Sequence, residues 1–163
     1  MAPFSAYLSS DDKALVPLGI PAAVKQQKIL MCMEHPTRLA DHNFTYAPGH
    51  KLRPSVDSLC NVISGLPGRQ DAVEYVGPTF VNIRSTFHNK GCAARHLEDW
   101  KNMFKESSEE VKRLIFMANG SKKPIWMIQS DAGPDHCCRS ESVILVLIAF
   151  CIFLDADWLG QFH

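Results

Sequence analysis

Hydrophobic and polar residues alternate over several short stretches of this chain, a pattern that predicts β-strands with one buried face. The alternation is most regular over residues 80–87. One side of that stretch carries Val81, Ile83, Ser85 and Phe87, and the other carries Asn82, Arg84 and Thr86. Residues 4–10 and 125–129 predict two more strands, and both end just before acidic residues.

Proline and glycine interrupt the other stretches in the first third of the chain. Residues 29–33 predict one more strand. The two prolines and the glycine of residues 14–21 exclude a helix there and leave a short edge strand or an extended turn. Residues 41–55 are polar and contain Pro48, Gly49 and Pro54, so we expect a hairpin or loop on the surface.

Apolar residues at helical spacing predict a first helix over residues 94–105, with Leu97, Trp100, Met103 and Phe104 on its apolar face. The remaining surface of that helix carries His96, Asp99, Asn102 and Lys105. We therefore expect these four side chains to be on the polar side.

Two further helices follow. Ser107 and Glu110 have the spacing of a capping box, so a second helix begins there and ends near Gly120. A third begins at residue 140 or 142 and runs to Leu154. Between the two, Pro124 separates the second helix from the strand at residues 125–129.

The order of these elements predicts the fold class. Several strands followed by helix, strand and helix are typical of an α/β protein with a mixed sheet and flanking helices. The 163 residues have the length of a single domain. Since parallel strands need a crossover, the strand before Asp131 is expected beside the strand before Asp11 and Asp12.

Residues 143–154 are apolar throughout and could be mistaken for a membrane anchor. A spanning helix needs about 20 such residues, so the pattern favours a buried core helix, and we expect no membrane association.

Composition limits the function only weakly. Lys and Arg total 17 and Asp and Glu total 17, so there is no overall field that attracts nucleic acid, although a local basic face is not excluded. The six cysteines form no C-x-x-C pair and no secretory signal precedes Phe4, which favours reduced thiols in an intracellular protein.

Two acidic segments carry the chemistry. Asp11 and Asp12 follow the first strand, and Asp131 and Asp135 follow the strand at residues 125–129. The plain interpretation is that these residues form turns and helix caps. Their placement after two strands of one sheet favours a second interpretation, in which paired carboxylates hold a divalent cation with substrate phosphates and water.

The same segments resemble a family. Residues 10–19 resemble the D-D-K-A-x-V-P-x-G opening of transposase-like proteins of mobile elements, and residues 130–136 resemble their D-G-G-P-D-H segment and the D-N-G-P segment of retroviral-type integrases. Residues 50–56, 77–80, 123–125 and 143–157 match further motifs in the same order, so the resemblance covers nearly the whole chain.

The resemblance implies a ribonuclease-H-like catalytic core of the DDE type that acts on DNA phosphodiesters with Mg²⁺ or Mn²⁺. The two metal-binding aspartates of such proteins follow the first and fourth strands. They correspond to Asp11, with Asp12 as the alternate choice, and to Asp131, while Asp135 and His136 would orient or cap the turn. A nuclear location is also implied.

The chain departs from that family in three respects. Ala132 stands where the family usually has Gly. The family's third acidic residue lies in an N-P-x-E segment on a later helix, and residues 159–163 end before such a segment. The family's N-terminal DNA-binding region is also missing before the first strand. The resemblance therefore implies a fragment or remnant, inactive alone, whose exposed hydrophobic face would favour self-association. The alternative is a non-enzymatic module that binds DNA or protein.

Two further interpretations, a zinc site and a cysteine nucleophile, are weaker. Cys92 and His96, or His136 with Cys137 and Cys138, could hold zinc, but the spacing departs from structural zinc sites. A cysteine nucleophile lacks a marked helix N-terminus with a basic partner.

Basic residues near the acidic segments could bind DNA phosphates. These residues are Lys13, Lys51, Arg53, Lys122 and Lys123. A solvated loop explains them equally well.

Overall fold

The computed structural model describes residues 4–18, 49–63, 65–66, 69–88, 91–105, 108–131, 133, 136–137 and 139–163. Within these residues the protein is an α/β structure with seven strands, three α-helices and one short 3₁₀ helix. Their order is β1 (Ser5–Asp12), β2 (Val16–Pro17), β3 (Lys51–Val62), η1 (Gln70–Ala72), β4 (Val73–Glu74), β5 (Thr79–Ser85), α1 (Ala93–Met103), α2 (Glu109–Ile115), β6 (Ile125–Ser130), α3 (Glu141–Leu154) and β7 (Trp158–Phe162).

The sheet is open and mixed. β3 pairs antiparallel with β1 along one edge and with β5 along the other, because Ser55 pairs with both Asp12 and Asn82. β2 pairs with the beginning of β3, and β4 pairs with its end. On the far side of β1 the strands are parallel: β6 pairs with β1, and β7 pairs with β6. The predicted parallel pairing of the two strands that precede the acidic segments is therefore confirmed.

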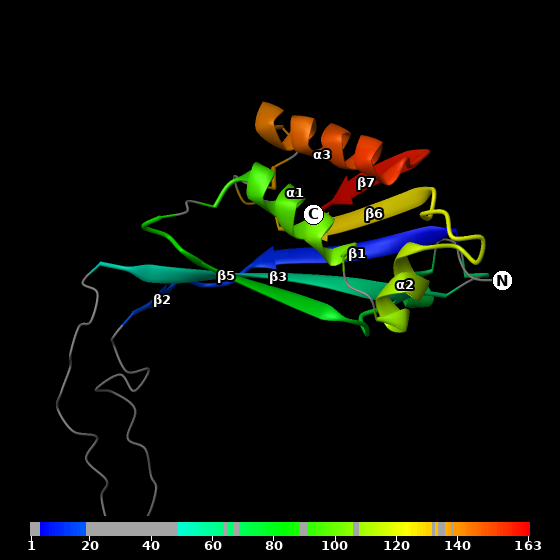
Figure 1. The fold of residues 1–163 in the computed structure, drawn as a ribbon, viewed down its shortest axis with the longest axis horizontal. Coiled ribbons are helices and arrows are strands. Elements are labelled where there is room, and N and C mark those ends of the chain that lie inside the picture. Colours follow the sequence, from blue (N-terminus) through cyan, green and yellow to red (C-terminus); the bar gives the residue numbers. More distant parts are fainter. Residues whose placement is uncertain are drawn as a thin grey trace, which may run out of the picture.

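The helices pack on one face of the sheet (Figure 1). Apolar side chains from β1, β3 and β6 meet the buried faces of all three helices in one core. Its largest fully buried members are Trp100, Trp126, Phe150, Leu8, Leu59, Ile115, Ile128 and Leu154. Alternate residues of β1 show which face is covered, since Ala6, Leu8 and Ser10 are buried and their neighbours are only partly so.

The most regular predicted strand exists as β5, but its apolar side does not face this core. Val81 and Ile83 are 57% and 64% exposed, whereas Phe80 packs against the core and Arg84 faces α1. Alternation alone identified the strand correctly. It did not identify which side the helices cover.

β3, the longest described strand, is where the sequence interpretation was wrong. Its first five residues fall in the segment predicted to be a surface loop, because Pro54 and polar residues hid the alternation. Pro54 has no N–H to donate, and its position in β3 makes this loss harmless. Its carbonyl accepts a hydrogen bond from Lys13 N at 2.8 Å, just past the end of β1. In an antiparallel strand the N and C=O of one residue point to the same neighbour, so the nitrogen of Pro54 faces the gap between β1 and β2, where no strand needs a donor.

The first two predicted helices are present with corrections. In α1, His96 and Asp99 were expected on the polar surface but are 1% and 8% exposed. In α2, Ser108 is the N-cap and accepts a hydrogen bond from Val111 N, so the predicted cap at Ser107 is wrong by one residue. α2 also ends at Ile115, before the predicted end, because the chain there turns back into a β-bridge between Phe116 and Lys122.

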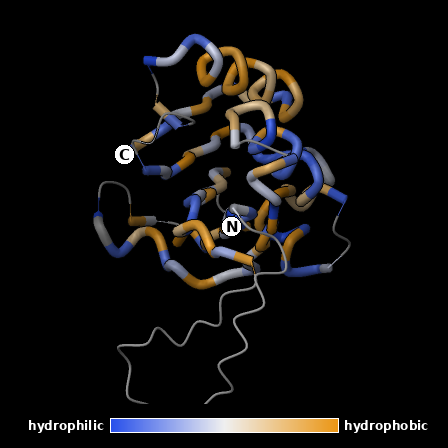
Figure 2. Tube along the Cα trace, turned by 90° about the vertical axis from the view of Figure 1, so that its left-hand side faces the viewer, coloured by the Kyte–Doolittle hydropathy of each residue, from blue (hydrophilic) through white to orange (hydrophobic). Residues whose placement is uncertain are grey.

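α3 begins after Ser140 and ends at Leu154, as predicted, but only one face is buried. Leu145 and Ile152 on its outer face are 66% and 75% exposed. Figure 2 shows this helix as hydrophobic along nearly its whole length. In the described part of the chain, no helix has the length and apolar character needed to cross a membrane.

Two further predictions concern other strands. Of the two alternatives left open for residues 14–21, a short edge strand or an extended turn, β2 supports the short strand. The predicted strand at residues 29–33 lies outside the described residues. β7 was not predicted from the sequence, and it forms the parallel edge of the sheet beside β6.

Candidate functional site

The two acidic segments meet at one end of the sheet. In the parallel pair of β1 and β6, Ser10 is in register with Ser130, so Asp11 and Asp12 leave β1 where Asp131 leaves β6. A pocket of about 260 Å³ opens at this point. Its lining residues are Asp12, Lys13, Ala14, Leu15, Arg53, Asp131 and Gly133. Carboxylates more than a hundred residues apart in the sequence therefore share one pocket.

Asp11 and Asp12 have different environments because successive strand residues point to opposite faces. Asp12 points to the helix-covered face, where its side chain is 14% exposed. The side chain of Asp11 is 44% exposed and pairs with Lys13. Of the two aspartates considered from the sequence, Asp12 is the one that lines the pocket with Asp131.

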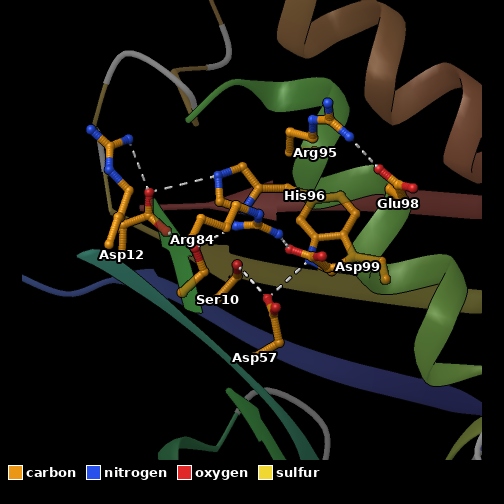
Figure 3. A network of polar contacts seen from close by, with 11 residues as sticks. Ser10, Asp12, Asp57, Arg84, Arg95, His96, Glu98 and Asp99 are labelled. Carbon is orange, nitrogen blue, oxygen red and sulfur yellow. Dashed lines mark hydrogen bonds and ion pairs between the residues drawn. The ribbon is translucent and has the colours of Figure 1, made fainter. Parts of the chain in front are cut away.

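Asp12 is held from several sides (Figure 3). Its Oδ2 lies 3.4 Å from Arg53 Nη1 and 3.9 Å from His96 Nε2, and its Oδ1 accepts a hydrogen bond from Ser55 Oγ. Arg53 and Ser55 come from β3, while His96 comes from α1. A carboxylate restrained in this way has a fixed orientation toward the pocket.

A second layer of polar contacts fixes α1 against the sheet behind Asp12. Arg84 of β5 donates a hydrogen bond to Ser55 Oγ at 2.9 Å and forms an ion pair with Asp99 of α1. Both side chains of this ion pair are about one tenth exposed. The pair therefore joins the helix that carries His96 to the strand next to the one that carries Arg53.

Asp57 forms a separate anchor deeper in the protein. It is fully buried, and its Oδ1 accepts hydrogen bonds from Ser10 Oγ at 2.7 Å and from Trp100 Nε1 at 3.0 Å. Its Oδ2 has no hydrogen-bond partner among the described residues. The contacts tie α1 to β1 and β3 one pleat away from Asp12.

The turn that carries Asp131 is held by the end of the chain. Gly133 N donates to Asp131 Oδ1 at 3.3 Å. Gln161 Nε2, on β7, donates to Ser130 Oγ and to the carbonyl of His136, both at 2.7 Å. His163 Nδ1 also lies 3.1 Å from the Asp131 carbonyl oxygen. β7 and the residue after it thus hold the segment that carries Asp131.

His136 follows the same turn and is 2% exposed. Its ring lies 4.2 Å from the ring of His96, centroid to centroid, so α1 and the turn after β6 are in contact. Asp135, which was expected to orient or cap the turn, lies outside the described residues.

The predicted basic residues fall into two groups. Lys13 and Arg53 line the pocket, and Lys51 begins the strand that carries Arg53. Lys122 and Lys123 precede β6 and so lie at the opposite end of that strand from Asp131. Lys122 Nζ donates to the Phe153 carbonyl and lies over the Phe153 ring, and Lys123 is buried. The structure does not bring these two lysines to the pocket.

The thiol and zinc interpretations gain no support. Among the described residues, no group of three or more His, Cys, Asp and Glu side chains is placed to hold a metal ion. Cys92 and Cys137 are free thiols, and Cys138 lies outside the described residues. Burial raises the pKa of the Cys60 thiol, which disfavours the thiolate.

A larger hollow of about 560 Å³ lies along α1 and is lined mainly by apolar groups and the charged ends of surface residues. Among the described residues that line it, Glu98 is the one carboxylate. Size alone would favour this hollow, whereas the chemistry favours the pocket between Asp12 and Asp131.

Comparison of the chain with protein-family models, curated proteins and solved structures gave no match. The site therefore has to be interpreted from its own geometry. That geometry adds Asp99, Asp57 and Ser55, which the sequence interpretation missed. It also places His96, considered from the sequence only as a surface residue or a zinc ligand, beside Asp12. The sequence held one signal for His96 and Asp99. Both lie within one helical turn of the apolar Trp100, so their side chains border the face of the helix that is buried.

Proposed function

We propose that this protein is a DDE-type, transposase-like chain with a ribonuclease-H-like core, and that the pocket holds a divalent cation and binds DNA phosphodiesters. The observation that carries the proposal is that Asp12 and Asp131 line one pocket at the ends of two adjacent parallel strands. A nuclear location follows from the resemblance in the sequence and belongs to the proposal. The resemblance implies a remnant that is inactive alone, so catalysis by the isolated chain is the part that the nicking experiment decides.

The arrangement of strands supports the resemblance. Counting only strands longer than two residues, β1 and β6 are the first and the fourth along the chain. The family motifs imply metal-binding aspartates after the first and fourth strands. Asp12 takes the first position in this proposal because it faces the pocket, whereas Asp11 pairs with Lys13 on the exposed side.

The donor set fits one magnesium or manganese ion. Both cations prefer oxygen ligands, and magnesium is usually held by one or two carboxylates together with substrate phosphates and water. Asp12 and Asp131 supply two carboxylates of this kind. A two-ion site usually needs a further acidic residue, and the described residues place no third carboxylate in the pocket lining.

Each side chain has a role in this proposal. Asp12 and Asp131 orient the cation, which supplies Lewis-acid polarisation of a phosphoryl oxygen when bound. The hydrogen bond from Ser55 orients the Asp12 carboxylate, with His96 Nε2 3.9 Å away, and the contacts of Gln161 hold the segment that carries Asp131. Lys13 and Arg53 place positive charge where phosphate oxygens would approach.

The test is nicking of supercoiled DNA in Mg²⁺ or Mn²⁺ by the wild-type chain and by Asp12→Asn and Asp131→Asn. Asp71→Asn is the matched control, because Asp71 is exposed and pairs with Arg69 at the other end of β3. Loss of metal-dependent nicking in the first two variants, with Asp71→Asn unchanged, supports the enzyme. Nicking that survives Asp131→Asn removes the site.

A binding module without turnover is the second candidate. It is favoured by the contact between Arg53 and Asp12, which occupies a carboxylate oxygen that a catalytic metal would need. In this case a labelled DNA oligonucleotide binds with an affinity that falls with salt, and no strand is cut. Fluorescence anisotropy at two salt concentrations distinguishes this module from a chain that does not bind DNA.

A further inference from the structure

Arg53 is more exposed than Arg84, the second arginine of the same network. Arg84 contacts Asp99 and Ser55, with its side chain 11% exposed. Arg53 is 28% exposed, lines the pocket and reaches Asp12 Oδ2 at 3.4 Å. Its guanidinium therefore stands beside the carboxylate on which the proposed cation depends.

A guanidinium and a divalent cation that bind the same carboxylate oxygen weaken each other's binding. Two positive charges brought within a few ångströms repel each other, and in a partly buried pocket this repulsion is only weakly screened. The arginine already in place therefore lowers the affinity of Asp12 for a metal ion.

A phosphate group changes this balance. Arginine binds phosphate oxygens through two parallel N–H donors, a stronger arrangement than the 3.4 Å contact between Arg53 Nη1 and Asp12 Oδ2. A phosphate in the pocket would draw the guanidinium from Asp12 and would also offer its own oxygen to the cation.

We infer that Arg53 is a phosphate-responsive competitor of the metal ion at Asp12, so that a phosphodiester and a divalent cation bind the pocket cooperatively. The inference rests on the proposed function, because it needs the cation site at Asp12 and Asp131. Cooperativity is reciprocal, so the cation should tighten phosphate binding by the same factor.

The experiment is a titration of the full chain with Mn²⁺, followed by the electron paramagnetic resonance signal of free Mn²⁺. It is done with and without inorganic phosphate at constant ionic strength and is corrected by a protein-free titration. In the wild type, phosphate should raise the Mn²⁺ affinity about five-fold or more. In Arg53→Gln, the affinity without phosphate should already be raised, and phosphate should change it little.

Two comparison variants separate direct competition from a general change in charge. Lys13→Gln removes a positive charge from the same pocket, but Lys13 pairs with Asp11 and not with Asp12. Arg69→Gln breaks an Arg–Asp pair that is more exposed and lies at the other end of β3. Direct competition requires a clearly larger rise in Mn²⁺ affinity for Arg53→Gln than for either of these.

Arg53→Lys keeps the charge and guards against a folding defect in Arg53→Gln. It should bind Mn²⁺ without phosphate as weakly as the wild type does. Equal Mn²⁺ affinity in the wild type and in a folded Arg53→Gln would overturn the proposed competition between Arg53 and the metal ion. A rise in Mn²⁺ affinity for Lys13→Gln as large as that for Arg53→Gln would overturn it too. If Arg53→Gln binds no Mn²⁺ at all, or if Asp131→Asn binds it normally, the proposed cation site itself fails.

Discussion

At the scale of single residues, Lys123 is a charged side chain placed where water does not reach. It is 2% exposed, and burial, together with the nearby charge of Arg113, lowers the pKa of Lys123 to about 8. Lysine in an unfolded chain titrates near pH 10.4. Between these two pKa values the unfolded state binds more protons, so the contribution of Lys123 to stability rises with pH in that window.

We therefore expect Lys123→Met to raise the free energy of unfolding at pH 7 by up to about 3 kcal/mol. The gain should shrink as the pH rises from 8 toward 10.5, where the wild-type lysine becomes neutral in both states. Urea unfolding at pH 7 and at pH 10 measures it. Lys112→Met, at an exposed position paired with Glu109, should change little at either pH. A Lys123→Met variant no more stable than the wild type at pH 7 would show that the charged form is well accommodated.

The residues of the candidate site were only partly predictable from the sequence. Asp12 and Asp131 could be singled out because each follows a strand, and parallel pairing placed them at one edge. Which of Asp11 and Asp12 faces the pocket depends on which face the helices cover, and no local pattern encodes that. His96 and Asp99 were expected on the surface because polarity was taken as exposure, whereas Asp99 is buried with Arg84 as a partner.

At the scale of the elements, the beginnings of α2 and α3 offer a matched pair of serine caps. Ser108 Oγ accepts a hydrogen bond from Val111 N at 3.3 Å. Ser140, the N-cap of α3, accepts no such bond from a backbone N–H of its helix, and its Oγ shares a hydrogen bond with Ser142 Oγ at 2.8 Å. A capping side chain contributes typically about 1 kcal/mol.

Ser108→Ala should therefore lower the free energy of unfolding by about 1 kcal/mol, and Ser140→Ala by clearly less. Chemical denaturation of the two variants beside the wild type checks the difference. Equal losses would mean that the hydrogen bond to Val111 contributes nothing particular to α2.

Local pattern predicted the elements well where one periodicity dominated. β1, β6, α1 and α3 were found near their observed bounds because each has a run of apolar residues at its own spacing. β3 was missed because its buried positions include Ser55 and Asp57, which are satisfied by partners from α1, β1 and β5. β7 was missed because its five residues are too few to show a clear alternation of apolar and polar side chains. Tertiary contacts created these two strands, and single-sequence patterns do not contain such contacts.

At the scale of the whole molecule, the outer face of α3 exposes more large apolar side chains than any other described helix. Leu145, Ile148 and Ile152 follow one another along this face and are all more than half exposed. Apolar side chains gathered in this way favour association over solvation.

Leu145→Lys with Ile152→Lys should reduce concentration-dependent self-association and leave the free energy of unfolding within about 0.5 kcal/mol of the wild type. Sedimentation velocity over a range of concentrations measures the first quantity and urea unfolding the second. The neutral pair Leu145→Gln with Ile152→Gln separates lost hydrophobicity from added charge. Unchanged self-association in both double variants would mean that another surface is responsible, for example the uncovered side of β5.

The position of His163 beside the Asp131 carbonyl has a practical consequence for the purification of this protein. A polyhistidine tag fused after His163 would put a strong chelator next to the pocket and would imitate the metal binding that the experiments seek. Ser5 lies at the other end of β1 from Asp12. An affinity tag placed before Ser5 lies away from the pocket. If the tag is removed before titration, the measured Mn²⁺ binding is that of the carboxylates and not of the tag.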